Sequence, residues 1–369
     1  MPVACLLCDS MVVPIRTVNN WELADVDQII DVRSPREFKT DHIPGAIILY
    51  VLSDQQHETV GRTYKQSPFE AKKLGASYVL TNISMHLEQF LRHKAKNFHP
   101  LFYCARGGQR SKSFATICGE IGWQCSVLEG GYKSYRSRVL SDLEALSEKL
   151  KIIIISGRTG TGKTRILEEL EKIGENIIDL EHLARHRGSL LGSFPELEQP
   201  QQKLFETLLC DQIKKLKFEN QVFIEAESSK IGNVQIPKPL WQAMRKSPEI
   251  LIKSDRSRRA DYLLNNYVSL KQNPAALFKL FRFLEKSGLN EVSKKCSEYV
   301  TARDWRPLAN LLLHSHYDKR YDRSIKIFGR QTIMEIELPE LNQMFFRSVA
   351  KKISETRLIN PEALSLSNE

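Results

Sequence analysis

Several features that mark specialised classes of protein are scarce in this chain of 369 residues. No apolar run reaches the roughly 18 residues that a membrane-spanning helix needs, and residues 1–15 lack the basic start of a signal peptide. The seven cysteines are few and odd in number, which excludes a disulfide framework and favours a reducing environment. With 18 glycines and 15 prolines, collagenous and wholly disordered chains are excluded as well. We therefore expect a soluble, cytoplasmic protein without a membrane span.

Positive charge is present in excess and is unevenly distributed. The formal net charge is +10, and residues 241–330 alone hold 19 Lys or Arg against 9 Asp or Glu. A concentrated basic surface is the usual mark of a polyanionic partner. A basic but merely solvated helix face would have the same composition, so charge alone leaves both interpretations open.

The apolar pattern of the first half predicts one α/β domain followed by a linker. In residues 1–136, short apolar runs alternate with helix-like stretches, which is typical of a parallel sheet. Residues 137–150 have apolar positions at helical spacing and predict an amphipathic linker helix. The predicted strands of the first domain are residues 28–32, 46–51, 101–104 and 125–128.

A second α/β domain is predicted over residues 151–255, followed by a basic helical region and C-terminal extension over 256–369. The second domain opens with the β-branched run 152–155, as expected of a strand buried on both faces. Residues 222–226 predict a further buried strand, and 331–338 alternate in part and predict a late one. The predicted fold class is thus α/β, with two successive parallel-sheet domains.

A phosphate-binding loop follows the first strand of the second domain. The residues match the pattern G-x-x-x-x-G-K-[ST] without a gap, between a predicted strand and a predicted helix. Its glycines let backbone amides point at phosphate oxygens, its lysine reaches the terminal phosphates, and its last threonine is a candidate Mg²⁺ ligand. The loop consists of Gly157, Arg158, Thr159, Gly160, Thr161, Gly162, Lys163 and Thr164.

Acidic partners for this loop are less regular than in an ordinary NTPase. The second buried strand ends in Glu225 and Glu227, where an NTPase usually carries an aspartate that holds Mg²⁺. Asp179 and Glu181 form a second acidic pair, and each could instead cap the helix that follows.

A second anion-binding loop lies in the first domain, between a predicted strand and a helix. Cys104 is placed where backbone amides and a helix N-terminus would stabilise a thiolate. Two arginines add positive charge, and two glycines let the backbone wrap around an oxyanion. By contrast, Cys5 and Cys8 form a single C-x-x-C without further zinc ligands, which favours a plain exposed pair. The remaining residues of the loop are Ala105, Arg106, Gly107, Gly108, Gln109, Arg110 and Ser111.

The first domain resembles a rhodanese (sulfurtransferase) domain. The resemblance rests on residues 31–38 and 41–46 as the early signature, and on 104–111 and 128–132 as the later ones. Cys104 and Arg110 have C-x₅-R spacing, one residue longer than in ordinary rhodaneses and as in dual-specificity phosphatases. The loop would thus admit a tetrahedral group of phosphate size.

A rhodanese-like domain joined to a phosphate-loop domain resembles the tRNA 2-selenouridine synthase family over residues 1–320. Further matching stretches are 179–189, 199–200, 225–228, 231–232 and 316–318. The resemblance implies that wobble 2-thiouridine in tRNA(Lys), tRNA(Glu) and tRNA(Gln) becomes 2-selenouridine. It implies S-geranylation from geranyl diphosphate, then displacement of the geranylthio group with selenophosphate.

The resemblance also implies roles for the two loops. Cys104 would carry selenium as a selanylcysteine, with Arg106 and Arg110 holding selenophosphate oxygens, and the phosphate loop would hold the prenyl diphosphate with Mg²⁺ on Thr164. Expected partners are the tRNA anticodon stem-loop and the enzyme that supplies selenophosphate. Candidate contacts to tRNA phosphates are Lys253, Arg256, Arg258 and Arg259.

Other function classes stay open on the sequence. An NTP-driven kinase or ATPase with a regulatory rhodanese-like domain would use the phosphate loop and turn over ATP without tRNA. A C-x₅-R phosphatase would use Cys104 instead. A non-catalytic RNA-binding protein is disfavoured because both loops are intact.

Overall fold

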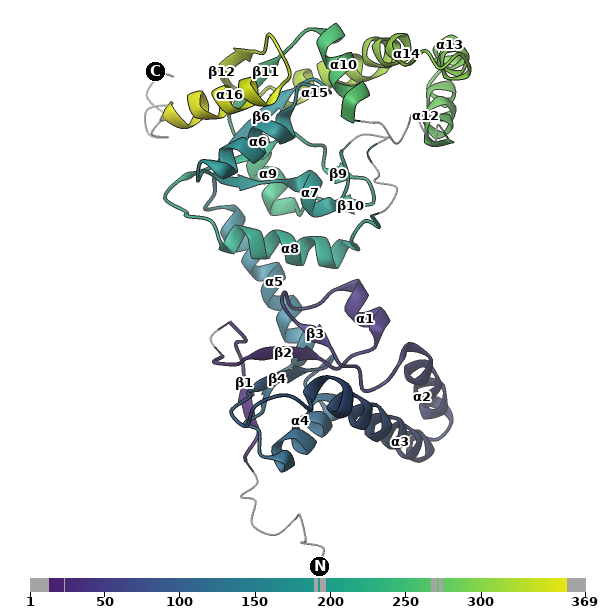
Figure 1. Ribbon diagram of the computed structural model, residues 1–369, viewed down its shortest axis with the longest axis vertical. Helices are drawn as coiled ribbons and strands as arrows, with labels where there is room; N and C mark the ends of the chain where they lie inside the picture. The colour runs from purple at the N-terminus through teal and green to yellow at the C-terminus, as the bar shows by residue number, and fades with distance from the viewer. Residues whose placement is uncertain are drawn as a thin grey trace, which may run out of the picture. The chain divides into compact units, whose positions relative to one another are not determined.

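The computed structural model describes residues 13–22, 24–188, 192, 197–266, 271 and 275–356, and divides the chain into two compact units (Figure 1). The first unit extends to Asp142 and includes Glu206–Leu208, and the second contains the rest. Each unit is built on a parallel five-stranded sheet, which confirms the predicted fold class. Cys5 and Cys8 lie outside the described residues.

The first sheet has the strand order β1-β5-β4-β2-β3, with every neighbouring pair parallel. Its central strand β4 is apolar and buried along its whole length, as a strand covered on both faces must be. Four of the five strands are those predicted from the sequence, and β1 was not predicted. The strands are β1 (Arg16–Val18), β2 (Gln28–Asp31), β3 (Ile47–Ile48), β4 (Pro100–Tyr103) and β5 (Ser126–Leu128).

Helices cover this sheet and supply its core. Apolar residues of β2, β4 and β5 pack against Ile83, Leu91 and Phe114 from the helices. The linker helix α5 begins at Gly131, earlier than the predicted residue 137, and the border between the two units falls inside it. The helices are α1 (Pro35–Thr40), α2 (Asp54–Gln66), α3 (Pro68–His86), the π-helical turn η1 (Leu87–Leu91), α4 (Gln109–Ile121) and α5 (Gly131–Ser147).

The second sheet has the order β12-β11-β6-β8-β7 and is again parallel throughout. Strand β12 is the predicted late strand, and it pairs with β11. The predicted domain border at residue 255 therefore divides this sheet, since β12 lies beyond it. The strands are β6 (Lys151–Gly157), β7 (Asn176–Ile178), β8 (Gln221–Glu225), β11 (Glu249–Lys253) and β12 (Thr332–Glu337), with an antiparallel pair β9 (Lys230–Ile231) and β10 (Val234–Gln235).

Two helices distant in sequence pack together on this sheet. The helices α6 and α16 lie side by side (Figure 1). Their apolar side chains share one core with those of β6, β8 and β11. The C-terminal helix is thus part of the phosphate-loop unit. The helices are α6 (Lys163–Lys172), α7 (Leu180–Ala184), α8 (Gln202–Lys214), α9 (Lys238–Lys246), α10 (Arg256–Asn266), α12 (Ala275–Lys286), α13 (Asn290–Thr301), α14 (Trp305–Leu312), η2 (Leu313–Tyr317), α15 (Asp318–Phe328) and α16 (Gln343–Glu355).

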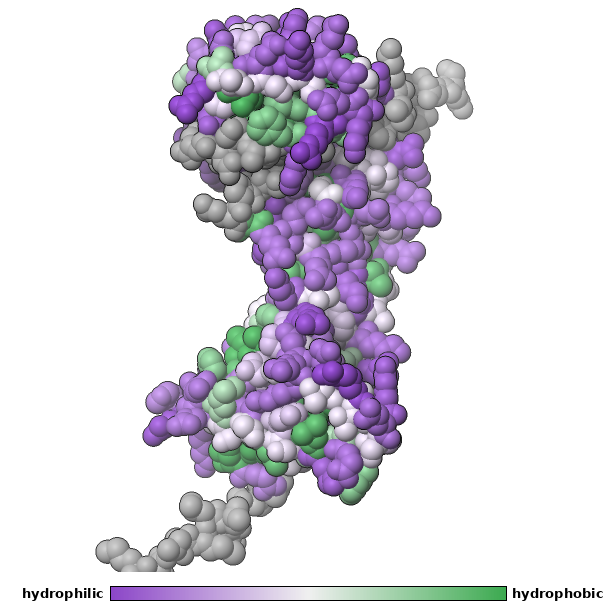
Figure 2. Space-filling view, turned by 90° about the vertical axis from the view of Figure 1, so that its right-hand side faces the viewer, coloured by the Kyte–Doolittle hydropathy of each residue, from purple (hydrophilic) through white to green (hydrophobic). Residues whose placement is uncertain are grey.

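The helices α12 to α14 form a smaller apolar cluster of their own, around Leu280, Leu284 and Cys296. At the surface, hydrophilic residues cover most of the face shown in Figure 2, with apolar residues scattered between them. Within the described residues, no helix is both long and apolar enough to cross a membrane.

Candidate functional site

Cys104 lies in the turn between β4 and α4 and is 3% exposed. Its Sγ accepts a hydrogen bond from the Gly108 amide at 3.2 Å and one from the Ser111 hydroxyl at 3.3 Å. Burial raises the pKa of Cys104, but the bonds from Ser111 and from the amides of Arg106 and Gly108 outweigh it and lower the pKa below its ordinary value. The donors of the loop thus favour the thiolate form of Cys104 more than an ordinary environment would.

A turn that contains two glycines follows β5, and its backbone packs against the cysteine loop. The Tyr132 amide donates to the Cys104 carbonyl at 2.8 Å, and the Lys133 amide donates to the Ala105 carbonyl at 3.0 Å. Gly131 has φ +56°, and a Cβ there would lie 2.2 Å from the Cys104 carbonyl oxygen. The stretch 128–132 therefore fixes the position of the cysteine loop, and Gly131 has no room for a side chain.

The two arginines of the loop are held differently. Arg110 Nη1 donates to Glu37 Oε2 at 3.0 Å, whereas Arg106 is exposed. Burial raises the pKa of Glu37, but the charge of Arg110 and the Ser34 amide outweigh it and lower the pKa. A guanidinium has five N–H donors, so Arg110 is anchored by Glu37 and has others left for an oxyanion.

The early rhodanese-like signature forms a buried network around the same loop. Arg33 makes a bidentate ion pair with Asp31 and donates to the Asp41 carbonyl at 2.6 Å. Its guanidinium lies 4.0 Å from the centre of the Tyr132 ring, and the Tyr132 hydroxyl donates to Asp41 Oδ2 at 2.8 Å. These contacts connect the end of β2 to Tyr132, in the turn that packs against the cysteine loop.

The phosphate loop lies between β6 and α6, in the context that the sequence predicts. Lys163 Nζ donates to the Gly157 carbonyl at 3.1 Å, so the lysine lies across its own loop. Gly162 has φ +81°, and a Cβ there would lie 2.5 Å from the Phe346 ring. The loop is therefore packed directly against α16.

Three carboxylates lie beside the phosphate loop, in different roles. The Thr164 hydroxyl donates to Glu181 Oε2 at 3.3 Å, and the Glu181 amide donates to Glu225 Oε1 at 2.8 Å. Asp179 accepts a hydrogen bond from the His182 amide at 2.7 Å and caps α7. Helix capping was one of its two predicted roles, beside that of an acidic partner of the phosphate loop. Glu181 is thus the carboxylate bonded to Thr164, and spacing alone did not single it out.

The pKa values of these three carboxylates and of the neighbouring Glu227 are raised together. Burial raises the pKa of Asp179 and Glu181, and it raises those of Glu225 and Glu227 well above the ordinary value, with neighbouring carboxylates adding to the effect. Glu225 is fully buried, and its Oε2 has no hydrogen-bond partner within the described structure. The cluster therefore favours a bound cation or proton.

The residues beside the phosphate loop fit a Mg²⁺ ion that is held by few protein ligands, as is usual beside a bound phosphate. Within the described residues, no group of three or more His, Cys, Asp or Glu side chains could hold a metal ion. Mg²⁺ usually takes one or two protein ligands and completes its shell with phosphate oxygens and water. The Thr164 hydroxyl and the Glu181 carboxylate would hold it, and it would supply charge neutralisation at the phosphates.

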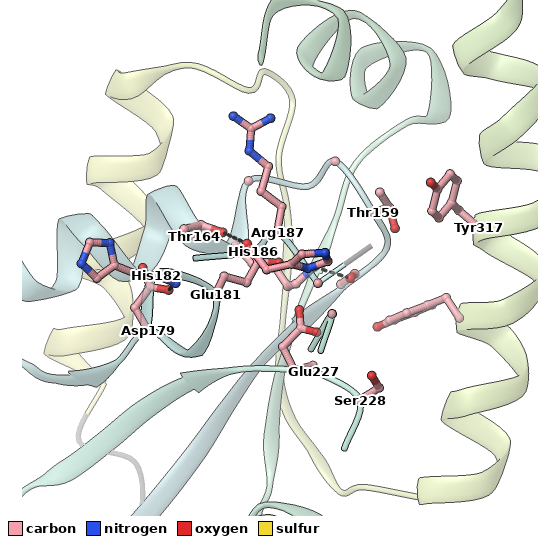
Figure 3. A pocket seen from close by; sticks show the side chains of 18 of the residues that line it. Thr159, Thr164, Asp179, Glu181, His182, His186, Arg187, Glu227, Ser228 and Tyr317 are labelled. Atoms are coloured by element: carbon pink, nitrogen blue, oxygen red, sulfur yellow. Dashed lines mark hydrogen bonds between the residues drawn. The ribbon is translucent and has the colours of Figure 1, made fainter. Parts of the chain in front are cut away.

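The phosphate loop opens into a cavity of 1260 Å³ within the second unit. Figure 3 shows Thr159 beside Tyr317 at one end and Asp179 with His182 at the other. Burial and Arg320 lower the pKa of His316 in its wall to about 4, so its imidazole is neutral at pH 7. All five matching stretches beyond the first domain contribute lining residues, including His186, Gln199, Glu227, Gly232 and His316.

The predicted basic contacts separate into exposed and buried residues. Lys253 is paired with Glu335 at 2.5 Å, Arg258 with Asp255 at 3.0 Å, and all three of Lys253, Arg256 and Arg258 are exposed. Arg259, by contrast, is 1% exposed and bonded to Asp318. Its prediction as a tRNA contact is wrong, because its guanidinium is buried and its donors are used by Asp318 and by the carbonyls of Thr159 and Ser254.

The fold and the two loops define a two-domain protein with a sulfurtransferase-like thiolate loop and a phosphate loop. A rhodanese-like domain matches residues 19–138, and a "tRNA 2-selenouridine synthase AAA domain" matches residues 150–301.

Curated relatives agree with both matches. Proteins named tRNA 2-selenouridine synthase are 35% identical over 245 residues in Nitrosomonas europaea and 37% identical over 250 residues in Bdellovibrio bacteriovorus. These alignments cover 65% of this chain and 63% and 64% of the relatives, so the chain spans just under two thirds of their length. In Shewanella denitrificans a protein of the same name is 32% identical, over 74% of this chain and 72% of the relative. The chain belongs to the tRNA 2-selenouridine synthase family.

Proposed function

We propose that this protein converts 2-thiouridine at the wobble position of tRNA(Lys), tRNA(Glu) and tRNA(Gln) to 2-selenouridine. The first step would be S-geranylation from geranyl diphosphate, and the second would be selenation from selenophosphate. One observation carries the proposal: a chain of this family holds both a stabilised thiolate at Cys104 and a phosphate loop that opens into a large cavity.

The phosphate loop suits the geranylation step. The 2-thio sulfur attacks C1 of the geranyl group, the C–O bond breaks, and diphosphate leaves with the electron pair, while N3 of the uridine loses its proton to water. Charge therefore develops on the diphosphate, where Lys163 and the amides at the start of α6 would stabilise it. A cavity of 1260 Å³ exceeds what a diphosphate alone requires and leaves room for the rest of the donor.

The cysteine loop suits the selenation step. Selenophosphate carries a tetrahedral oxyanion, and the loop offers amides around Cys104 together with Arg106 and Arg110. In this step selenium forms a bond to C2 of the uridine, the C–S bond breaks and geranylthiol leaves, while water cleaves the P–Se bond and phosphate is released. A lowered pKa gives Cys104 thiolate character beside that reaction. The tRNA backbone would be bound by the exposed Lys253, Arg256 and Arg258.

The test is mass spectrometry of nucleosides from a 2-thiouridine-containing anticodon stem-loop incubated with the protein, geranyl diphosphate and selenophosphate. We expect a gain of geranyl mass, followed by replacement of the geranylthio group by selenium. A folded protein that binds the RNA but leaves the uridine unchanged would contradict the proposal. RNA-independent ATP turnover by that protein would support the NTP-driven alternative.

Two variants separate the steps. Cys104→Ser should abolish selenation and leave S-geranylation, because it removes only the thiolate. Lys163→Ala should lower the rate of geranylation by about a hundredfold, since the positive charge that would stabilise the leaving diphosphate is lost. Matched controls are Cys118→Ala, a buried cysteine in the same domain, and Lys172→Ala at the exposed end of α6. Selenouridine formed by Cys104→Ser would show that the role of this cysteine is wrong.

A further inference from the structure

The buried Arg259 connects the phosphate loop to two other segments of the second unit. Its Nη1 and Nη2 donate to the two carboxylate oxygens of Asp318, each at 2.9 Å. The same Nη1 donates to the Thr159 carbonyl at 3.1 Å, and Nε donates to the Ser254 carbonyl at 3.2 Å. One side chain of α10 thus joins the loop, the end of β11 and the start of α15.

The bond to Thr159 affects the direction of a loop amide. In a trans peptide the C=O and the following N–H point in opposite directions. Because Arg259 holds the Thr159 carbonyl, the Gly160 amide is directed away from Arg259. Backbone amides of such a loop are the groups that bind phosphate oxygens. A Cβ on Gly160 would lie 3.1 Å from the Arg259 carbonyl oxygen, so the backbone of α10 also packs on the loop.

Asp318 supplies the negative charge that the buried Arg259 needs. A buried guanidinium is strongly destabilising without a partner, and the bidentate carboxylate supplies one. Arg158 of the loop also approaches Asp318, with 3.9 Å between Nη1 and Oδ2, and its Nη2 donates to Asp322 at 2.8 Å. The acidic start of α15 therefore holds one arginine of the loop and one arginine of α10.

We propose that Arg259, held by Asp318, is a positioning residue that fixes the phosphate loop in its anion-binding conformation. This inference rests on the proposed function only in assigning a diphosphate to the loop. Arg259 itself bonds to the loop backbone and is not one of the residues that line the cavity. Arg256 and Arg258 in the first turn of α10 are exposed, so the helix that would meet the RNA is also the helix that holds the loop.

The first test measures the loop without any ligand. Amide hydrogen exchange of peptides that cover residues 157–164 should be about tenfold faster in Arg259→Gln than in the unmodified protein. Arg258→Gln is the matched control, because it removes the same charge from the exposed face of α10 and should leave exchange within about twofold. Unchanged loop exchange in folded Arg259→Gln overturns the proposal.

The second test measures binding of inorganic pyrophosphate by calorimetry, well below the unfolding temperature. We expect Kd to rise about tenfold in Arg259→Gln, less in Arg259→Lys, and not in Arg258→Gln. A lowered Tm with unchanged Kd would show a purely structural role and would also overturn the proposal.

If Arg259→Gln does not fold, Asp318→Asn replaces it, and the same shifts in exchange and Kd are required. If the unmodified protein does not bind pyrophosphate, the proposed use of the loop is wrong. The exchange measurement then still decides whether Arg259 holds the loop.

Discussion

At Cys104, two opposing effects decide whether the thiol is ionised. Burial disfavours the thiolate, while the Ser111 hydroxyl and the loop amides favour it, and the net result is a lowered pKa. Cys118, which lies within α4, behaves in the opposite way, because its contact with Cys125 and its burial raise its pKa. Reactivity toward an electrophile should therefore distinguish these two thiols.

We expect the rate at which iodoacetamide alkylates Cys104 to reach half its maximum at a lower pH than that of a free cysteine in the same series, because the pKa of Cys104 is lowered. Because the folded pKa is depressed, the thiolate persists as the pH falls below the pKa of a free cysteine. Ser111→Ala removes one donor and should move the profile to higher pH. Peptide mass spectrometry across a pH series measures this, with Ser113→Ala as control. Identical profiles for Ser111→Ala and the unmodified protein would contradict the role of this hydroxyl.

The sequence was sufficient to predict that Cys104 and Lys163 lie where a strand gives way to a helix, because each lies in a short motif with a fixed context. It was not sufficient for Glu37 or Asp318. Glu37 contacts Arg110 across 73 positions, and Asp318 contacts Arg259 across 59. Such pairs depend on how elements pack, and no local pattern encodes them.

At the scale of elements, the turn between β5 and α5 decides where the cysteine loop lies. A side chain at Gly131 would collide with the Cys104 carbonyl and occupy a left-handed backbone conformation. Gly131→Ala should therefore lower the free energy of unfolding by at least about 1–3 kcal/mol, and selenation should fall with it. Denaturant unfolding of the full chain measures the change.

The control for this prediction is a glycine in an ordinary helix. Gly61 lies in α2, is exposed, and has open space where a Cβ would be. Gly61→Ala should raise the free energy of unfolding by about 0.5–1 kcal/mol. Equal effects of the two substitutions would show that the turn does not constrain the loop.

Periodicity and β-branched runs were enough to predict most strands and the late strand β12. They did not show that β12 pairs with β11, or that α16 packs on α6. Both contacts join segments separated by a long helical insertion, so the predicted border at residue 255 was drawn where composition changes. A change in charge composition reflects which residues lie at the surface, whereas the extent of a sheet depends on which segments pack together in the core.

At the scale of the whole molecule, the excess charge lies in the segment 241–330, which belongs to the phosphate-loop unit. Part of that charge is used internally, since Arg259 is buried and Arg330 is half-buried. Arg256 and Arg258 of α10 are exposed instead. Exposed residues such as these, and not the buried ones, are the ones that an RNA backbone would meet.

Salt dependence should report these exposed contacts. Each lost phosphate contact lowers the slope of log K against log salt by about 0.7 to 0.9, because fewer counterions are released. The double variant Arg256→Gln, Arg258→Gln should therefore bind the anticodon stem-loop with a slope reduced by about 1.4 to 1.8. Filter binding between about 50 and 200 mM salt measures it. The control Lys65→Gln, Lys73→Gln removes two exposed charges from the first unit and should leave the slope unchanged. Equal slopes for both double variants would exclude α10 as the RNA-binding helix and assign the basic excess to solvation.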